Sequence, residues 1–413
     1  MRRLLLTGAT SLLVIGTMSP ALADTEREDC GPGDHPGSAS AATASFLDPT
    51  AVVSGAEHVA LGTQVYVGPF AELLADADSP IRIGEASNVQ DNVLVDATGG
   101  SGIEIGDRVI LAHGASVLGS AEVGVEVSSL PDDLTVETYE GSVFLSFGSQ
   151  VDGGVVEVNS GVSALGRVGP GVTLRSGYLV LPGKNVTTQE EADDPALGKV
   201  RYINQADIEF NEGVIHVNES LAREYTELHR ESRNAVRGVN VDPGGSDFNQ
   251  DRDLPSFAGE EKAVPGHRNR IIGDVDLADR FGRYDRAAGD RISVRADEGE
   301  PFEVGHIGHM GDDVVFHALE HTDIHVGDGV RYGRGAIVHG GGRVVVEGQP
   351  DEQTVVGDLV RLGEESVVFR STVGDGASIG ARSAVVGTDL PAGAVVGDRT
   401  IILNGTVFGP VEW

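Results

Sequence analysis

A six-residue repeat runs through this chain and limits its possible folds more than any other property of the sequence. An aliphatic residue is followed by Gly, and a small or aliphatic residue comes three positions after that glycine. The motif occurs at residues 61–65, 67–71, 83–87 and 105–109, and returns at 326–330, 362–366, 373–377 and 379–383. Such hexapeptides build a parallel β-helix, in which the aliphatic side chains point into a triangular prism and about 18 residues complete one coil.

The composition agrees with this fold class. Gly makes up 58 of the 413 residues, about twice its usual share, and aromatic residues are only 5%. Glycine suits tight turns between short strands, where a side chain would clash or where a positive φ is needed. The predicted fold class is therefore mainly β.

A second repeat acts over a longer distance. When the sequence is shifted by 221 residues, two stretches align without gaps, so that Asp76 meets Asp297 and Gly106 meets Gly327. The chain therefore holds two tandem β-helix domains, copy one at 45–236 and copy two at 260–413. The intervening segment at 237–259 is polar and rich in Gly, Asp and Asn, which is typical of a linker.

The end of copy one differs from the end of copy two. Residues 221–236 carry mixed charge and contain no Gly or Pro, which predicts a C-terminal α-helix. Asn218 or Ser220 could cap its first turn. Copy two stops at Trp413 without a matching segment.

The first residues are typical of an export signal. Residues 1–23 combine Arg2 and Arg3 with an apolar stretch and end in Ala-Leu-Ala, an A-x-A-type cleavage site. The paired arginines leave twin-arginine and Sec export both open. Residues 24–44 are then a flexible lead-in, and no later apolar run reaches membrane length. We expect an extracellular or cell-surface protein, in which the single Cys30 is incidental rather than a lipid attachment point.

The charge balance excludes several classes of partner. Asp and Glu number 64 against 30 Lys and Arg, a net charge of −34. Nucleic acids and anionic membrane surfaces are recognised by clustered Lys and Arg, so neither is an expected partner. Acidic residues spread along the whole chain favour a halophilic source. One cysteine excludes a disulfide framework and a Cys-rich zinc site.

Several motifs resemble those of the γ-class carbonic anhydrases. Copy two carries RADEG at 295–299, HALE at 317–320 and VHG at 338–340, and copy one carries SNVQD at 87–91, LAHG at 111–114 and VNESLA at 217–222. The resemblance implies a left-handed β-helix with a C-terminal helix, assembled as a trimer. It also implies a metal between subunits, held by three histidines, that interconverts carbon dioxide and bicarbonate. Zinc is the default metal, and iron or cobalt fits the same ligands.

Neither copy contains the complete ligand set of that family. The three ligand positions are Asp96, His113 and Leu118 in copy one, and His317, Arg334 and His339 in copy two. The resemblance implies that the first and third ligands come from one subunit and the second from its neighbour. The losses are therefore complementary, and they predict one composite site built from His113, His317 and His339.

The residues that surround the ligands are divided in the same way. Copy two keeps Arg295, Asp297, Glu298 and Glu320, whereas copy one keeps the amides Asn88, Gln90 and Asn218. By the resemblance, Glu298 takes a proton and Glu320 moves it outward. The resemblance also implies that Gln90 and Asn218 hydrogen-bond the nucleophile and the substrate, and that Arg295 and Asp297 brace the subunit or domain interface as an ion pair.

The lost ligands raise a question of assembly. A closed ring of three domains cannot alternate two kinds of domain, so mixed rings from several chains, an open pair and a separate partner subunit all stay open. At an interface without metal, Arg334 could pair with Asp96. We expect an oligomer that contains trimeric rings of β-helix domains.

Three functions compete at this point. The leading hypothesis is an exported, metal-dependent carbonic anhydrase, a zinc lyase. The second is a non-catalytic scaffold or assembly protein of the same fold. The third is a hexapeptide acyltransferase, which the RADEG and HALE segments disfavour. Fold alone does not choose among them.

Overall fold

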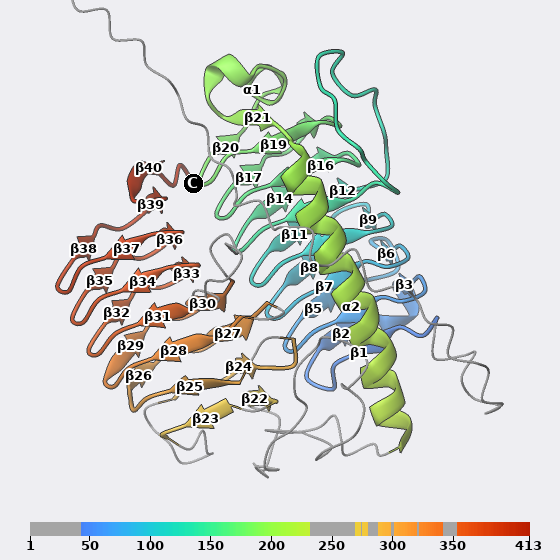
Figure 1. The fold of residues 1–413 in the computed structure, drawn as a ribbon. Coiled ribbons are helices and arrows are strands. Elements are labelled where there is room, and N and C mark those ends of the chain that lie inside the picture. The colour runs from blue at the N-terminus through green and yellow to red at the C-terminus, as the bar shows by residue number, and fades with distance from the viewer. Residues whose placement is uncertain are drawn as a thin grey trace, which may run out of the picture.

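The protein consists of two parallel β-helices that lie side by side (Figure 1). The computed structural model describes residues 43–231, 269–273, 275–279, 288–298, 301–319, 322–341 and 353–413. The predicted signal peptide, Cys30 and the predicted linker at 237–259 lie outside these residues. The predictions of a mainly β fold, of two tandem β-helix domains and of a helix after the first are confirmed.

Copy one has three sheets, one for each side of a triangular prism. Sheet A contains β1 (Phe46–Leu47), β4 (Tyr66–Val67), β7 (Asn88–Val89), β10 (Val109–Leu111), β13 (Val143–Leu145), β16 (Ser160–Val162), β19 (Tyr178–Val180) and β21 (Val200–Tyr202). Sheet B contains β2 (Val52–Ser54), β5 (Glu72–Leu74), β8 (Leu94–Asp96), β11 (Ser116–Leu118), β14 (Gln150–Asp152), β17 (Arg167–Val168) and β20 (Asn185–Val186). Sheet C contains β3 (Val59–Leu61), β6 (Ile81–Ile83), β9 (Ile103–Ile105), β12 (Glu122–Val123), β15 (Val155–Val156) and β18 (Thr173–Leu174). The helical segments are η2 (Ala56–His58), α1 (Gln189–Asp193), η3 (Pro195–Leu197) and α2 (Gln205–Glu231).

Copy two repeats the three-sided arrangement without a long helix among its described residues. Sheet D contains β22 (Asn269–Ile272), β24 (Ile292–Arg295), β27 (Val315–Ala318), β30 (Ile337–Gly340), β33 (Val367–Phe369), β36 (Ala384–Val386), β39 (Thr400–Leu403) and β40 (Thr406–Pro410). Sheet E contains β23 (Val275–Leu277), β25 (Phe302–Val304), β28 (Ile324–Val326), β31 (Thr354–Val356), β34 (Thr372–Val373) and β37 (Asp389–Leu390). Sheet F contains β26 (Ile307–Met310), β29 (Val330–Tyr332), β32 (Arg361–Leu362), β35 (Ser378–Ile379) and β38 (Val395–Val396).

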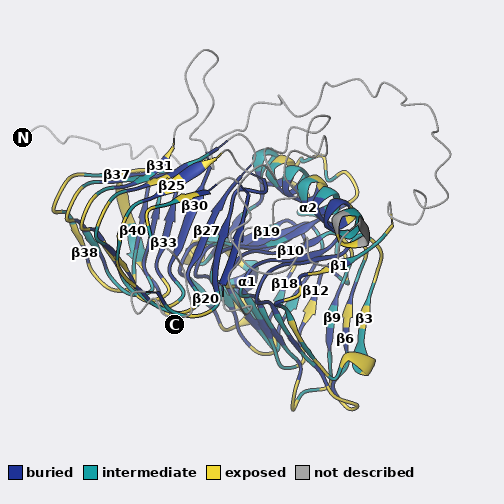
Figure 2. Ribbon diagram, turned by 90° about the horizontal axis from the view of Figure 1, so that it is seen from below, coloured by how far each residue is buried: buried dark blue, intermediate teal, exposed yellow. Residues whose placement is uncertain are grey.

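Each sheet is a ladder in which equivalent residues of successive coils stack on one another. On sheet A, Val67, Val89 and Leu111 are neighbours in register, and all three are completely buried inside the prism. Burying each such side chain contributes about 1.5–3 kcal/mol, so every coil adds to the core. Figure 2 shows buried strand residues in both copies and along the boundary between them.

Close approach between coils explains the glycines of the hexapeptide. A Cβ on Gly84 would lie 2.5 Å from the carbonyl carbon of Gly106, and one on Gly106 would lie 2.0 Å from the carbonyl oxygen of Gly124. The left-handed turn conformation falls two positions later, at Ala86 (φ 55°) and Arg108 (φ 57°). Of the two predicted reasons for glycine, it is the steric one that applies at these positions.

The long helix begins earlier than the sequence predicts. The prediction places it at 221–236, whereas α2 spans Gln205–Glu231 of the described residues. Asn204 and Asp207 cap its start reciprocally, because Asp207 N donates to Asn204 Oδ1 at 3.1 Å and Asn204 N donates to Asp207 Oδ2 at 2.8 Å. Asn218 and Ser220 therefore lie inside the helix and are not its caps. No helix in the described part of the chain is long and apolar enough to cross a membrane.

The two copies run in the same direction and are joined along their length. Their ion pairs include Arg270–Asp48 at 2.8 Å, Arg295–Asp91 at 2.7 Å and Lys199–Glu412 at 2.7 Å. At the far end, Trp413 Nε1 donates to the carbonyl oxygen of Leu165 at 2.7 Å. Because early coils meet early coils and late coils meet late coils, the prism axes are parallel.

Candidate metal centre between the two copies

Three histidines from the two copies converge at the boundary. His317 on β27 and His339 on β30 are neighbours in register on sheet D, and His113 lies two residues after β10 of copy one. His113 Nε2 is 3.1 Å from His317 Nδ1, and His317 Nδ1 is 3.3 Å from His339 Nε2. All three side chains are buried, and their ligand atoms lie within 4.8 Å of one another.

The outer nitrogens of the histidines have partners that orient the rings. His113 Nδ1 lies 2.8 Å from Asp91 Oδ2, and His339 Nδ1 donates to the carbonyl oxygen of Gly340 at 2.7 Å. His317 Nε2 lies 3.4 Å from Glu298 Oε2 and 3.6 Å from Asp297 Oδ1. Partners of this kind fix the tautomer of a metal-binding histidine and turn its other nitrogen toward the ion.

Burial keeps two of the imidazoles neutral. It lowers the pKa of His317 to about 4, and the positive charge of Arg295 adds to this effect. It also lowers the pKa of His339 well below its ordinary value, and the nearby His317 and His113 imidazoles lower it further. Neutral imidazoles are the form of histidine that binds metals.

A charged network of both copies supports the centre. Arg295 donates to Asp91 Oδ2 through Nη1 at 2.7 Å and to both carboxylate oxygens of Asp297 through Nε at 3.0 Å. Ser293 Oγ donates to Asp91 Oδ1 at 2.7 Å, and Tyr225 of α2 donates its hydroxyl hydrogen to Asp297. Although burial alone raises the pKa of each aspartate, the Arg295 guanidinium between them holds both pKa values well below the usual range.

The amides predicted from the sequence lie in copy one, close to the same boundary. Asn88 on β7 is completely buried, and neither of its side-chain amide atoms has a hydrogen-bond partner among the described residues. Gln90 is 8% exposed. It directly precedes Asp91, the residue that contacts His113. Asn218 is buried on α2, and its amide nitrogen donates to the carbonyl oxygen of Val214 at 2.8 Å. Of the predicted acids, Glu298 is buried beside His317, whereas Glu320 lies outside the described residues.

Asp96 and Arg334 do not meet within one chain. Asp96 accepts hydrogen bonds from the backbone nitrogen (2.9 Å) and the hydroxyl (2.6 Å) of Thr98. Arg334 pairs with Asp313 at 2.9 Å, and its side chain is 72% exposed. Their predicted ion pair would therefore have to form between chains, and it stays a prediction.

Sequence reasoning missed several residues of the centre. Asp91 stands inside the SNVQD motif, but its contact with His113 crosses from one coil to the next. Phe147 lies parallel to the His113 ring, with centroids 5.9 Å apart, and 4.9 Å from the His339 ring. Phe369 follows His339 on the next rung of sheet D, with ring centroids 5.4 Å apart. No motif marks the two phenylalanines.

The comparisons with known proteins identify the family. No family model matches the chain. The chain is 34% identical over 203 residues to a carbonic anhydrase from Methanosarcina thermophila, across 44% of this chain and 73% of that protein. The chain belongs to the γ-class carbonic anhydrase family. The resemblance to this family that the sequence motifs predict is thereby confirmed.

Solved structures with similar coils were also found. A hexapeptide transferase family protein from Anaplasma phagocytophilum is 22% identical, covering 43% of this γ-class chain and 91% of its own, with a TM-score of 0.31. A UDP-N-acetylglucosamine acyltransferase from Campylobacter jejuni is 10% identical, covering 88% and 73%, with a TM-score of 0.15. Scores this low do not bear on the function of the carbonic anhydrase homologue.

Proposed function

We propose that this protein is an exported, metal-dependent carbonic anhydrase with one composite catalytic centre between its two copies. The observation that carries the proposal is the meeting of three inward-facing nitrogens from His113, His317 and His339. Neither copy contains these three ligands alone, and the family relationship supplies carbon dioxide and bicarbonate as the substrates. Export is proposed from residues 1–23.

The positions of the protons favour a cation at this point. His113 Nδ1 lies beside the Asp91 carboxylate, and His339 Nδ1 donates to the Gly340 carbonyl. When each neutral ring carries its proton on Nδ1, its Nε2 lone pair faces inward. His317 Nδ1 faces the other two histidines, and Nε2 faces the carboxylates of Glu298 and Asp297. If the neutral ring carries its proton on Nδ1, its Nε2 lone pair therefore points at these carboxylates. Without a cation, lone pairs would therefore face one another or an anion in a buried space, which is costly.

The spacing also fits the metal. In a tetrahedral zinc site with Zn–N distances of about 2.0–2.1 Å, ligand nitrogens lie about 3.3 Å apart. The two separations that involve His317 are 3.1 and 3.3 Å. Three histidine ligands leave a fourth position open, as in catalytic rather than structural zinc sites. Iron or cobalt fits the same donors.

The chemistry that a bound divalent metal supplies is acidification of a water molecule, which gives a nucleophile for carbon dioxide at neutral pH. The chain's own residues then orient the substrate and remove a proton. We assign the orientation to the amides of Asn88, Gln90 and Asn218. We assign proton transfer to the Glu298 carboxylate, which lies 3.4 Å from His317 Nε2. Glu320 is proposed to pass the proton outward.

Metal content measured with carbon dioxide hydration tests this proposal. Protein purified at high salt without chelators should carry about one zinc or iron per chain and should hydrate carbon dioxide. His113→Ala and His317→Ala should each lose the metal and the activity, because three ligands become two. His325→Ala is the control, since His325 is half-exposed and contacts Glu303.

A folded wild-type protein without metal would refute the enzyme proposal and leave the scaffold alternative. Retention of metal by His113→Ala would refute the composite centre alone, because copy two would then be sufficient. Loss of metal in His325→Ala would show that the effect is not specific to the three ligands.

A further inference from the structure

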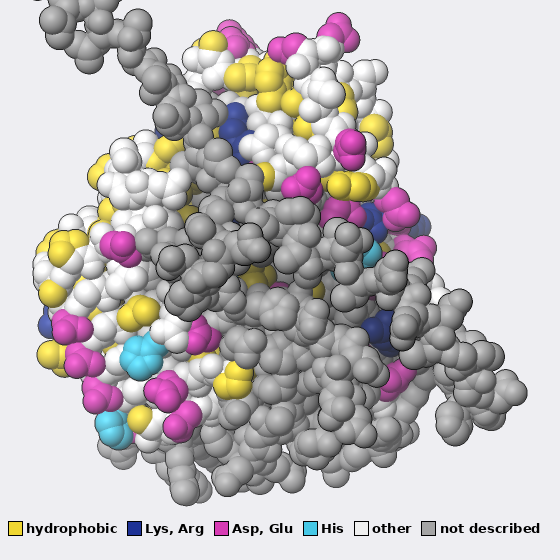
Figure 3. Space-filling model, viewed as in Figure 1, with side chains coloured by type: hydrophobic (Ala, Val, Ile, Leu, Met, Phe, Trp, Pro, Cys, Tyr) yellow, Lys and Arg dark blue, Asp and Glu magenta, His cyan; other side chains and the backbone are white. Residues whose placement is uncertain are grey.

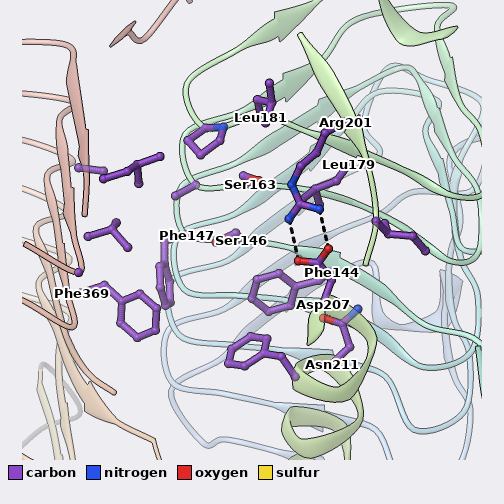
Figure 4. Close-up of a pocket in the computed structure, with 18 of the residues that line it drawn as sticks. Phe144, Ser146, Phe147, Ser163, Leu179, Leu181, Arg201, Asp207, Asn211 and Phe369 are labelled. Carbon is purple, nitrogen blue, oxygen red and sulfur yellow. Dashed lines mark hydrogen bonds and ion pairs between the residues drawn. The ribbon is translucent and has the colours of Figure 1, made fainter. Parts of the chain in front are cut away.

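A cavity of about 380 Å³ lies between the two copies (Figure 4). Sheet A, the start of α2 and the later rungs of sheet D form its walls. The lining residues that matter here are Phe144, Phe147, Phe369, Ala384, Val386 and Leu403. In Figure 4, the Phe147 and Phe369 rings lie between the strands of the two copies.

The cavity and the metal centre share a wall. The Phe147 ring that lines the cavity also stacks on His113 and contacts His339. Phe369 also lines the cavity and contacts the His339 ring from the copy-two side, with the two ring centroids 5.4 Å apart. A single layer of aromatic side chains therefore separates the cavity from the histidines.

The order of rungs on sheet D makes the two sides of the centre chemically different. Successive strands place the following residues in one column: Arg295, His317, His339, Phe369, Val386 and Leu403. Arg295, with Asp91, Asp297 and Glu298 near it, stands on one side of the histidines. The apolar residues that line the cavity stand on the other side.

Several charged and polar groups of the cavity wall are held by other protein groups, whereas Asn159 Oδ1 has no hydrogen-bond partner among the described residues. Arg201 makes two hydrogen bonds of 2.7 Å to Asp207. Asn211 Nδ2 donates to Ser142 Oγ at 3.1 Å. Arg370 packs its guanidinium over the Phe369 ring, 4.6 Å from the centroid. The surface beside Phe147 and Phe369 is thus left mainly apolar.

We propose that this cavity binds uncharged carbon dioxide and delivers it to the histidine centre past Phe147 and Phe369. The inference rests on the proposed function and names the route of its substrate. Carbon dioxide has no net charge and no dipole, and apolar cavities of proteins bind such small molecules. Bicarbonate carries a charge, which an apolar passage disfavours.

Filling the cavity tests the route. Ala384 on β36 is completely buried and lines the cavity, so Ala384→Leu should occupy part of it. Ser163→Leu fills from the copy-one wall and serves if Ala384→Leu does not fold. Ala60→Leu on the exposed face of sheet C is the matched control. We expect about a tenfold lower kcat/KM for carbon dioxide hydration in a filled variant, with the metal content unchanged, and no change in the control.

Crystals pressurised with xenon give a second readout that needs no activity. Xenon should occupy the cavity of the wild-type protein and should be displaced from the part of the cavity that the new leucine fills in the variant. A wild-type cavity without xenon would overturn the inference, and so would a filled variant with undiminished kcat/KM. A metal-loaded wild-type protein that binds xenon but does not hydrate carbon dioxide would instead overturn the proposed function, and the delivery role with it.

Discussion

At the scale of single residues, Asp91 links the two halves of the candidate metal centre. Its carboxylate accepts hydrogen bonds from Ser293 and Arg295 of copy two. The same carboxylate contacts His113 of copy one. One carboxylate therefore contacts the His113 ring and ties it to the network that flanks His317. A carboxylate behind a ligating histidine also raises the basicity of the imidazole.

Asp91→Asn should weaken metal binding by about 10- to 100-fold, the usual effect of losing such a partner. The amide keeps the size of the side chain but removes the charge that faces Arg295 and His113. Competition with a chelator of known affinity measures the effect. Asp152→Asn, which changes an aspartate paired with Arg167 on sheet B, is the control. Unchanged metal affinity in Asp91→Asn would contradict the role given to this carboxylate.

At the scale of elements, Glu157 anchors the irregular segment at 124–142 between β12 and β13. Its Oε2 accepts from Ser128 N at 3.1 Å and from Ser176 N at 2.9 Å, and also from the Ser128 hydroxyl. Leu134 and Val136 of this segment pack on Leu179, Ile203 and Ile208. Because Ile203 directly precedes Asn204 and Ile208 lies in the first turn of α2, the segment supports the start of the helix.

Glu157→Gln should loosen this segment, since it replaces hydrogen bonds to a charged acceptor worth about 1.5–3 kcal/mol. We expect amide hydrogen exchange at 126–140 to rise about tenfold, which corresponds to about 1.4 kcal/mol. Glu122→Gln, on the exposed face of β12, should leave the exchange unchanged. Equal exchange in the wild type and Glu157→Gln would show that the segment is held by its apolar contacts alone.

The same anchor should weaken in acid. Burial alone raises the pKa of Glu157, but the hydrogen bonds from Ser128 and Ser176 lower it below its ordinary value of 4.5. The stability that it contributes is therefore present above pH 4.5 and is lost as the pH falls through the lowered pKa. Exchange at 126–140 in the wild type should rise over that range, whereas Glu157→Gln should lack this component. Identical pH profiles for the two proteins would contradict the assignment.

At the scale of the whole molecule, Asp96 and Arg334, which replace histidine ligands of the family, lie on two different faces. Asp96 lies on sheet B and Arg334 follows β29 of sheet F, whereas the metal centre lies between sheets A and D. Acidic side chains are scattered over the face of the molecule seen in Figure 3, in keeping with a net charge of −34. We propose that oppositely charged positions on sheets B and F meet between chains in a larger assembly.

If Asp96 of one chain pairs with Arg334 of another, Arg334→Asp should lower the oligomer mass. The substitution would place a second carboxylate opposite that of Asp96. The double variant Asp96→Arg with Arg334→Asp should restore the mass, which light scattering after size-exclusion chromatography at high salt can measure. Arg82→Glu on the exposed face of sheet C is the control. A double variant that fails to restore the assembly would count against the pairing.

Much of this protein could be predicted from the order of its residues, and the remainder depends on packing between distant segments. The hexapeptides predict the coils because strand, turn and inward-facing residue all lie within six positions. The 221-residue offset predicts two copies, and the family pattern predicts His113, His317 and His339. By contrast, α2 begins at Gln205 because Asn204 caps it and because Ile208, Val214 and Ile215 pack on other elements. The contact of Asp91 with His113 and the wall of Phe147 and Phe369 follow no local pattern. They arise where coils stack or where residues about 200 positions apart are brought together by parallel packing of the two prisms.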